Sequence, residues 1–444
     1  MARSAFRLLP QTLLVALLAQ TGLASAQSVD AATLARLTPQ FDAIQPKMVA
    51  WRRDIHQHPE LSNQEHRTAK LVAEHLKKLG LEVQTGVGGT GVVGLLKGGK
   101  PGKVVALRAD MDALPVAEQS GLPFASKAKQ INMGVESPVM HACGHDGHTA
   151  MLMGVAEVLA GMRSQIKGSV KFIFQPAEEG HSRQEDLGKP VGAKAMVDAG
   201  VLTNPKPDAA FAVHIIPTLP SGMIGYRSGP LFASGDTVRI TVTGKQTHGG
   251  FPWNGIDPIV ASAQVVTALQ TVVARQLEIT KEPAVVSIGQ INGGNRSNII
   301  PTSVEMAGTL RTFDEGMRAD AKQRITRAAE AAAAANGATA KVTFDPFGYP
   351  VTVNDAALTQ SMIPVLKKVT NGNAQEASKF MASEDFSEFA NSVPGMYVVL
   401  GAAPEGKTPA TAAPNHSPFF DFDEKAMPVG AKAMAAMALD FLAR

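Results

Sequence analysis

Apolar runs and amphipathic stretches alternate along the first half of the chain. Their spacing predicts two helices within 49–79, a hairpin at 81–98, strands at 103–116, 169–180 and 208–216, and helices at 149–162 and 191–199. His58-Pro59-Glu60 separates the first two helices, and Gly80 is a typical stop for the second. Because strands and helices alternate, this part of the chain is expected to form an α/β domain, a mostly parallel sheet flanked by helices.

The pattern changes near residue 230. The elements predicted from there are a strand at 237–245, a helix at 258–275, strands at 284–293 and 303–313, a helix at 316–335 and a strand at 340–347. This β-α-β-β-α-β order is the ferredoxin-like arrangement of a small separate domain. Helices then alternate again with an apolar strand at 396–403. We therefore expect a larger domain formed by 27–229 and 347–444, interrupted by a smaller domain at 230–346.

The first 26 residues have the pattern of a secretory signal peptide. Arg3 and Arg7 form a positive start, an apolar stretch follows, and Ala24-Ser25-Ala26 has the small-x-small form of a cleavage site. A permanent membrane anchor is disfavoured because the apolar stretch is short and is broken by Pro10. We expect cleavage after Ala26, export to the periplasm or medium, and no membrane contact in the mature form.

The charge and cysteine content narrow the possible functions. The formal net charge is only +3, and the signal peptide contributes two of those charges. This balance gives no indication of a nucleic-acid-binding surface. The chain has one cysteine, so it has no internal disulfide. That cysteine lies in His141-Ala142-Cys143-Gly144-His145-Asp146-Gly147-His148, beside three of the eleven histidines.

Most other candidates for chemistry lie where predicted strands end, as sites of α/β sheets do. They are Asp110, Asp112, Glu178, Glu179, His214 and, across a loop, His416. Together with Cys143 and His145 they offer thiolate, imidazole and carboxylate donors, a set that suits Zn²⁺ and similar transition metals better than Mg²⁺ or Ca²⁺. Adjacent extended residues point to opposite sides, so one of the two glutamates can bind metal while the other reaches a water molecule.

Plainer roles remain open for several of these residues. His141 and His148 are favoured as residues that hold the loop or support a ligand from behind. Asp110 has the alternative of an ordinary cap or turn residue, and paired glutamates are usually a solvated surface feature. Cys143 has the alternative of a buried structural thiol.

An ordered series of motifs resembles a known family. The motifs are RRDIHQHPELS, LRADMDALPV, MHACGHDGHTAMLMG, FQPAEEG, AVHIIP, HGGFPWNGIDPI, SNIIP, GTLRTF, SEDFS and NHSPFF, spread over roughly residues 45–440. They are similar to the amidohydrolase branch of the aminoacylase/carboxypeptidase metallopeptidase family, which includes hippurate hydrolase, auxin-conjugate hydrolases and N-acetyldiaminopimelate deacetylase.

The resemblance implies two divalent metal ions side by side in the larger domain. It implies as ligands Cys143, His145, Glu179, His214 and His416. Other branches of the family have a histidine where this chain has Asp110, and the thiol of Cys143 with His145 replaces that donor here. Glu178 would be the general base, and Asp112 would orient a ligand imidazole.

The resemblance also implies roles for the smaller domain. His248, Asn298 and Arg311 match positions that clamp the substrate and face its carboxylate or developing oxyanion. In several relatives this domain supports dimerisation and its histidine serves the partner's site, so a homodimer or higher homo-oligomer is expected. His56 and His58 match the N-terminal motif and are interpreted as structural or rim residues.

The expected function is hydrolysis of the amide bond of N-acyl amino acids, hippurate-like or N-acetylated, by a water that two metal ions activate. Zn, Mn, Ni and Co all suit the donors. A carboxypeptidase or dipeptidase acting through the same site is the enzymatic alternative. The alternative from another class is a non-catalytic periplasmic protein that captures a metal or a small ligand. The acyl preference stays open, because Phe251, Trp253 and Phe380 suit the lining of an apolar pocket and core packing explains them equally well.

Overall fold

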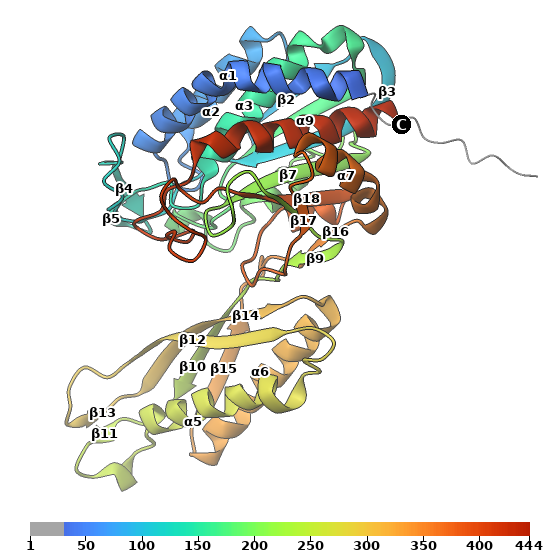
Figure 1. The fold of residues 1–444 in the computed structure, drawn as a ribbon. Helices are drawn as coiled ribbons and strands as arrows, with labels where there is room; N and C mark the ends of the chain where they lie inside the picture. Colours follow the sequence, from blue (N-terminus) through green and yellow to red (C-terminus); the bar gives the residue numbers. More distant parts are fainter. Residues whose placement is uncertain (1–30) are drawn as a thin grey trace, which may run out of the picture.

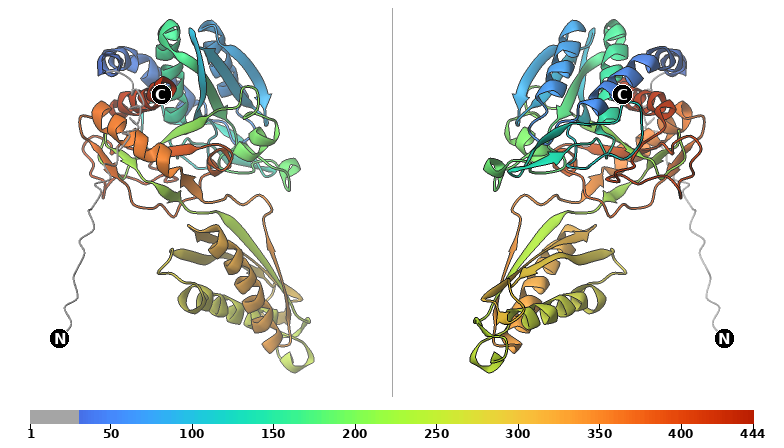
Figure 2. Two further views of the ribbon diagram at one scale, coloured as in Figure 1. Left: turned by 90° about the vertical axis from the view of Figure 1, so that its right-hand side faces the viewer. Right: turned by 90° about the vertical axis from the view of Figure 1, so that its left-hand side faces the viewer.

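The computed structural model describes residues 31–444. The predicted signal peptide, residues 1–26, lies outside the described residues. The chain forms two domains joined by two neighbouring connections, which Figures 1 and 2 show as a narrow waist between an upper and a lower body. Within the described residues, one helix, Glu424–Ala443, is long and apolar enough to cross a membrane, but 78% of its apolar window is buried inside the protein.

The larger domain is built on an eight-stranded sheet (Figure 1). In spatial order its strands are β1 (Glu82–Val87), β2 (Gly91–Lys97), β6 (Lys167–Gln175), β3 (Lys100–Asp110), β7 (Ala209–Ile216), β18 (Gly395–Gly401), β8 (Ile224–Tyr226) and β17 (Ala374–Glu376). The central pairs β6–β3, β3–β7 and β7–β18 are parallel, and every residue of β7 and β18 is buried. Burial on both faces explains why these strands are continuous apolar runs.

Helices cover both faces of this sheet. They are α1 (Ala31–Gln57), α2 (His66–Lys78), α3 (His145–Gly161), α4 (Gly192–Asp198), α7 (Ala356–Val369), α8 (Ser387–Ala390) and α9 (Met427–Ala443). The helices α1, α3 and α9 pack on one another and share the main hydrophobic core with Phe211 of β7. The short helices α4 and α8 contribute to a second core, which contains Ala210 and Ala212 from the opposite face of the same strand. The sheet is therefore sandwiched between two helical layers.

The smaller domain is a four-stranded antiparallel sheet with two helices. Its strands are β12 (Ala284–Gly293), β14 (Ser303–Thr312), β10 (Asp236–Thr243) and β15 (Thr339–Phe344), and its helices are α5 (Pro258–Thr271) and α6 (Glu315–Ala335). Alternating burial along β10 matches a sheet that is covered on one face, and both helices share an apolar core with it. The predicted fold class is confirmed: a mostly parallel α/β domain with a separate ferredoxin-like domain.

Several short strands were not predicted. They are β4 (Lys129–Asn132) with β5 (Val135–Pro138), β9 (Gly229–Phe232) with β16 (Thr352–Asn354), and β11 (Thr247–His248) with β13 (Ile299–Ile300). The strands β8 and β17 at one edge of the large sheet were also missed. Each spans two to four residues, which is too short for a hydrophobic period to emerge from the sequence.

Three local predictions need correction. The first helix, predicted within 49–79, begins earlier, at Ala31. The helix expected from Thr149 begins at His145, because Gly144, with a φ of 97°, makes the sharp turn into it. Glu178 and Glu179 are not extended as expected. The chain leaves β6 at Gln175, the following proline cannot continue the ladder, and Ala177 adopts a φ of 53°, so the two glutamates lie in a turn.

Candidate metal centre and active site

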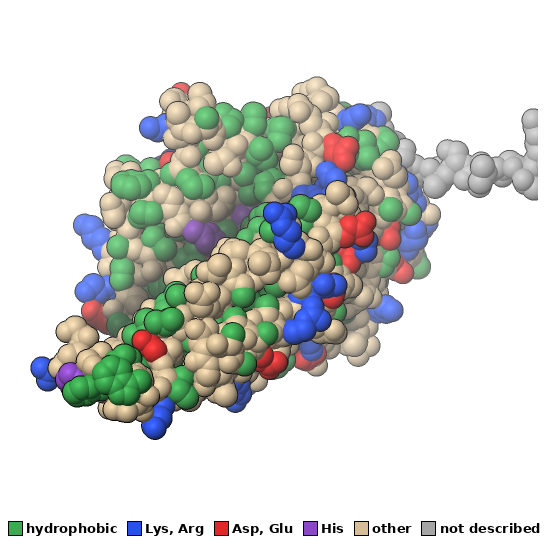
Figure 3. Space-filling model, turned by 90° about the horizontal axis from the view of Figure 1, so that it is seen from below, with side chains coloured by type: hydrophobic (Ala, Val, Ile, Leu, Met, Phe, Trp, Pro, Cys, Tyr) green, Lys and Arg blue, Asp and Glu red, His purple; other side chains and the backbone are tan. Residues whose placement is uncertain are grey.

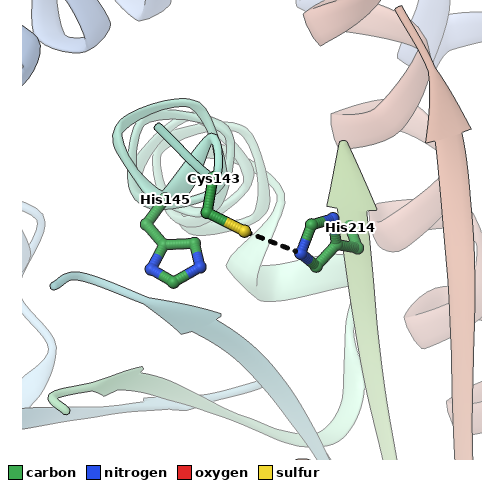
Figure 4. A group of neighbouring side chains, drawn as sticks. All are labelled: Cys143, His145 and His214. Carbon is green, nitrogen blue, oxygen red and sulfur yellow. Dashed lines mark hydrogen bonds between the residues drawn. The ribbon is translucent and has the colours of Figure 1, made fainter. Parts of the chain in front are cut away.

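The candidate site lies at the carboxyl ends of the central parallel strands of the large sheet. Asp110 is the last residue of β3, the turn with Glu178 and Glu179 follows β6, and His214 lies on β7. Because these neighbouring strands are parallel, their carboxyl ends lie together and place these side chains close to one another. Cys143 precedes α3 and His145 begins it, and Figure 4 shows the sulfur directed at the His214 ring with the His145 ring beside it.

The five predicted metal ligands form one connected group. The candidate ligand atoms of Cys143, His145 and His214 lie within 4.8 Å of one another, and so do those of Cys143, Glu179 and His416. Cys143 Sγ is 3.5 Å from His214 Nε2, and His416 Nε2 is 3.2 Å from Glu179 Oε1. Because both groups include Cys143, the arrangement offers two adjacent positions that share the thiolate.

Two of the imidazole rings in this group have their orientation fixed by the main chain. His145 Nδ1 is 2.8 Å from the main-chain oxygen of Asp112, and His214 Nδ1 is 2.8 Å from that of Ile215. These contacts make each ring a donor at Nδ1, so Nε2 is the nitrogen left to bind a metal ion. His145 Nε2 is buried and has no hydrogen-bond partner among the described residues. A buried polar nitrogen without a partner is costly, so the donor set fits a bound cation.

The charge balance leads to the same conclusion. Burial lowers the pKa of His145, yet Asp110 and Cys143 raise it overall, well above its ordinary value. His145 Nε2 also lies 3.8 Å from Asp110 Oδ2, 3.9 Å from Glu178 Oε2 and 4.0 Å from Glu179 Oε1. The surroundings of this nitrogen therefore favour positive charge beside it, which a divalent ion would supply.

Three residues with open alternatives now have defined surroundings. His148 Nε2 accepts a hydrogen bond from the Ile215 N–H at 2.8 Å, and Nδ1 is 2.6 Å from Asp110 Oδ1, so both its nitrogens have partners within the protein. Asp110 is no simple cap, because its other oxygen accepts from Arg108. His141 is buried with neither nitrogen hydrogen-bonded within the described chain, and burial lowers its pKa to about 3, so it is neutral.

Glu178 and Asp112 lie at the border of the ligand group. Glu178 is 6% exposed, and burial together with neighbouring carboxylates raises its pKa well above the ordinary range. Asp112 Oδ1 is 3.3 Å from His145 Nδ1, while Asp112 Oδ2 accepts from the Glu179 N–H and from the Ser62 hydroxyl. Glu178 is therefore a buried carboxyl of high proton affinity, and Asp112 links the imidazole to the glutamate turn.

A buried ionic network behind the site was not predicted. Arg108 is 2% exposed and donates to Asp110, Glu384 and Asp385 at 2.6–2.9 Å. Two neutral side chains complete the network by donating to its acids, Gln175 to Asp385 and Tyr397 to Glu384. The motif SEDFS contained two of these acids, but only as a match to the family. Arg108 lies within an apolar run, whose pattern predicts a buried strand and gives no information on a buried charge.

The three substrate-clamping candidates of the small domain lie in two places. Arg311, on β14, donates through Nη1 to the Ser383 hydroxyl of the large domain. His248 is on β11 and Asn298 directly precedes β13, and the Gly249 N–H donates to the Asn298 carbonyl at 2.8 Å. We call this pair of strands the β11–β13 ribbon.

The β11–β13 ribbon is remote from the candidate metal ligands. Its labels in Figure 1 stand at the end of the small domain that points away from the large domain, and His248 and Asn298 are both exposed. Among residues 31–444, no hydrogen bond or ion pair joins either side chain to the metal-ligand group. Within one chain, the structure therefore brings Arg311 near the site and leaves the other two candidates outside it.

The molecule has a hollow beside the small domain when it is seen from below (Figure 3). Figure 3, seen from below, shows histidine side chains inside it and hydrophobic side chains on its walls. On the small domain, Phe251 is 51% exposed and Trp253 is 75% exposed, and Phe251 contacts both the Trp253 ring and His248. Core packing, one of the two interpretations left open for these aromatic residues, is therefore wrong for Phe251 and Trp253.

Comparisons with known proteins agree with this architecture. The model of peptidase family M20/M25/M40 matches residues 106–440. Thermostable carboxypeptidase 2 of Saccharolobus solfataricus is 43% identical over 91% of this chain and 98% of its own length. N-acyl-L-amino acid amidohydrolase of Geobacillus stearothermophilus is 42% identical over 70% of this chain and 79% of its own length.

A solved structure extends the agreement to three dimensions. The YXEP protein of Bacillus subtilis, a dinuclear metal-binding peptidase of the M20 family, is 36% identical, with a TM-score of 0.73 over 90% of this chain and 99% of its own. The resemblance predicted from the motifs is confirmed. The chain belongs to peptidase family M20/M25/M40, in its amidohydrolase branch, and is a metal-dependent hydrolase of amide bonds.

Proposed function

We propose that this protein hydrolyses the amide bond of N-acyl amino acids, hippurate-like or N-acetylated, with two divalent ions per subunit. The observation that carries the proposal is the group centred on Cys143, which is buried except at Glu179 and His416 and has Glu178 beside it. Its five ligands would hold the ions, which supply Lewis-acid activation of water and of the scissile carbonyl. Zn, Mn, Ni and Co remain candidates, because thiolate and imidazole accept each of them.

Glu178 performs the proton transfers in this proposal. Its carboxylate accepts a proton from the attacking water and delivers it to the leaving nitrogen of the amino-acid product. A carboxyl with a raised pKa holds that proton long enough to pass it on, and its burial excludes bulk water from the transfer. Asp112 contacts both the Glu179 N–H and the His145 ring, so it fixes the position of the glutamate turn relative to that ring.

The small domain supplies groups for the substrate. Arg311 is half-buried near the connections between the domains, and its guanidinium is suited to a substrate carboxylate. Because His248 and Asn298 are remote from the metal ligands within one chain, we propose that a homodimer brings them to the site of the partner copy. The exposed aromatic pair beside His248 is consistent with a surface that another copy covers.

The carboxypeptidase alternative shares this site and has one specific observation in its favour, the 43% identity to a protein named as a carboxypeptidase. The non-catalytic alternative has no support, since the chain retains a base and a complete donor set within a hydrolase family. We also retain export of the mature chain as a proposal. N-terminal sequencing of protein recovered outside the cytoplasm would begin at Gln27 if it is right.

A substrate panel tests the proposed function. The protein is stripped with a chelator, reloaded with Zn²⁺, Mn²⁺, Ni²⁺ or Co²⁺ in turn, and assayed on hippurate, N-acetyl amino acids and unblocked dipeptides. We expect kcat/KM for each acylated amino acid to exceed that for a dipeptide with the same C-terminal residue by roughly tenfold or more. The free amine of a dipeptide would be buried without a partner in an acyl pocket, and one such polar group costs about that factor. The reverse order would establish the carboxypeptidase alternative, and hydrolysis of neither class with any metal would reject both.

A further inference from the structure

The turn that carries both glutamates is held by side chains from three other parts of the chain. Ala177 adopts the left-handed conformation, with a φ of 53°, which a non-glycine residue keeps only where its surroundings enforce it. Three bonds enforce it: Ala177 N–H to Glu65 Oε1 at 2.9 Å, Glu179 N–H to Asp112 Oδ2 at 2.9 Å, and the Tyr349 hydroxyl to the Glu178 carbonyl. Three consecutive residues are thus fixed through their main chains.

Two of these bonds come from the large domain itself, and the third does not. Glu65 precedes α2 and Asp112 follows β3, so both move with the sheet. Tyr349 instead lies on the return connection between the domains, after β15 and before β16. The two connections pair with each other at this point: Gly235 and Tyr349 exchange both main-chain hydrogen bonds, each 2.8 Å long.

The main chain around Tyr349 is attached to the small domain. Arg318 of α6 donates to the Gly348 carbonyl and forms an ion pair with Asp236 at the start of β10. Glu315, also on α6, accepts from the Val351 N–H at 2.7 Å. A rotation of the small domain therefore moves the main chain of Tyr349, while the Tyr349 hydroxyl remains bonded to the glutamate turn of the large domain.

We propose that Tyr349 is a positioning residue, which transmits the orientation of the small domain to Glu178 through the carbonyl of that residue. The proposal rests on the proposed role of Glu178 as the general base. It explains why a tyrosine between the domains extends its hydroxyl to a main-chain atom of the large domain. Burial, Asp385 and Glu178 raise the pKa of Tyr349 well above its ordinary value, so the hydroxyl remains protonated and available as a donor.

The test removes only this hydroxyl. Tyr349→Phe is compared with the wild type and with Tyr226→Phe, a matched control on β8 at the other side of the sheet. Hydrogen exchange, followed by mass spectrometry on metal-loaded protein, reports on the Ala177 and Glu179 amides independently of activity. We expect their exchange to accelerate about tenfold in Tyr349→Phe, the scale of losing one hydrogen bond, and to be unchanged in Tyr226→Phe.

Kinetics then separates positioning from a general loss of stability. In Tyr349→Phe we expect kcat to fall about tenfold with KM changed less than about twofold, because the base is misplaced and the substrate contacts remain. Unchanged exchange in the turn would overturn the proposal whatever the activity. If exchange accelerates as expected but the wild type hydrolyses none of the substrates, the proposed function alone is rejected.

A second variant tests transmission between the domains. Arg318→Gln loosens the attachment of Gly348, while Asp236 keeps Lys322 as its partner at 2.6 Å. If Tyr349 is the link, Arg318→Gln lowers kcat by itself but has no further effect in the Tyr349→Phe background. Multiplicative effects of the two substitutions would show that the small domain reaches the site by another route, and would reject the transmission.

Discussion

The two domains keep their functional side chains in opposite environments. In the large domain the candidate ligands and their partners are mostly buried, with Arg52 and Arg108 among the largest fully buried side chains. In the small domain the core is apolar, and His248 is exposed on a two-residue strand. The difference indicates that the large domain preassembles the candidate site, whereas the β11–β13 ribbon of the small domain would contribute only after closure or another copy brings it to a site.

The largest effect is expected from substituting the proposed base of the large domain. In Glu178→Gln we expect kcat to fall about 10³-fold or more, because general acid–base catalysis typically contributes about 10²–10⁴-fold. Metal content, measured by elemental analysis, should be unchanged. The matched variant Glu179→Gln removes a proposed ligand and should lower metal affinity. If Glu178→Gln instead lost metal and Glu179→Gln kept it, the two roles would have to be exchanged.

The next effect concerns the ionic network behind the site. Arg108→Met leaves Asp110, Glu384 and Asp385 without their shared cation inside the large domain. Removing one partner of a buried ion pair typically costs about 3–5 kcal/mol, so we expect the free energy of unfolding by urea to fall by that amount. Arg239→Met is the control, since its ion pair with Asp345 is exposed and long, at 3.7 Å. If both variants lost the same small amount of unfolding free energy, the contrast between a buried ionic network in the large domain and exposed ion pairs in the small domain would be contradicted.

The network shows where prediction from sequence ended. Strand order along the chain, the inserted domain and the ligand types followed from hydrophobic periods and from polar residues at strand ends, because these are local patterns. Glu384 and Asp385 lie 276 and 277 residues from Arg108 in the chain, and no local pattern reports their meeting. The turn at Ala177 was missed for another reason, since a positive φ at alanine depends on distant bonds such as the one from Glu65.

The sequence predicted which small-domain residues are candidates, but not where they lie relative to the site. The motifs THGGFP, RSNIIP and TLRTF named His248, Asn298 and Arg311, but motif order carries no information on which copy of the chain they serve. Only the folded geometry separates Arg311, in contact with Ser383, from the remote pair on the β11–β13 ribbon. The residue types of the site and the convergence of its candidate metal ligands were therefore predictable, and the placement of the small-domain residues was not.

Subunit mixing tests that assembly. His248→Ala should lower kcat/KM about 10²-fold, the scale of losing one oxyanion donor. If the histidine acts in the partner's site, mixing His248→Ala with Glu178→Gln under subunit exchange restores activity, because one site of each heterodimer has both residues intact. Equal mixing should recover roughly a quarter of wild-type activity.

Two measurements control the mixing experiment. Mixing two preparations of the same variant should restore nothing, and sedimentation should show dimers throughout. A monomer with full activity, or heterodimers as inactive as their parents, would place His248 in the site of its own chain and require the small domain to move much farther.

The smallest expected effect is a pH dependence confined to the large domain. His56 is buried, with Nδ1 at 2.9 Å from Asp146 Oδ2 and Nε2 at 3.1 Å from Glu118 Oε1. Burial lowers its pKa, but the bonds to both carboxylates raise it overall above the ordinary value. Because the folded-state pKa is raised, the stabilisation is fully present below the unfolded pKa of about 6.5 and is lost as pH rises through the folded-state pKa.

We therefore expect the wild type to exceed His56→Gln in free energy of unfolding by about 2 kcal/mol near pH 6, with the gap narrowing as the pH is raised. Urea unfolding of chelator-treated protein at a series of pH values measures the gap without interference from metal release. His58→Gln is the control, because its ring is about half-exposed and bonds to the main chain of Asp54. A gap for His56→Gln that widened with pH would mean that the buried ring is neutral, and Arg52 would then supply the positive charge beside Asp146.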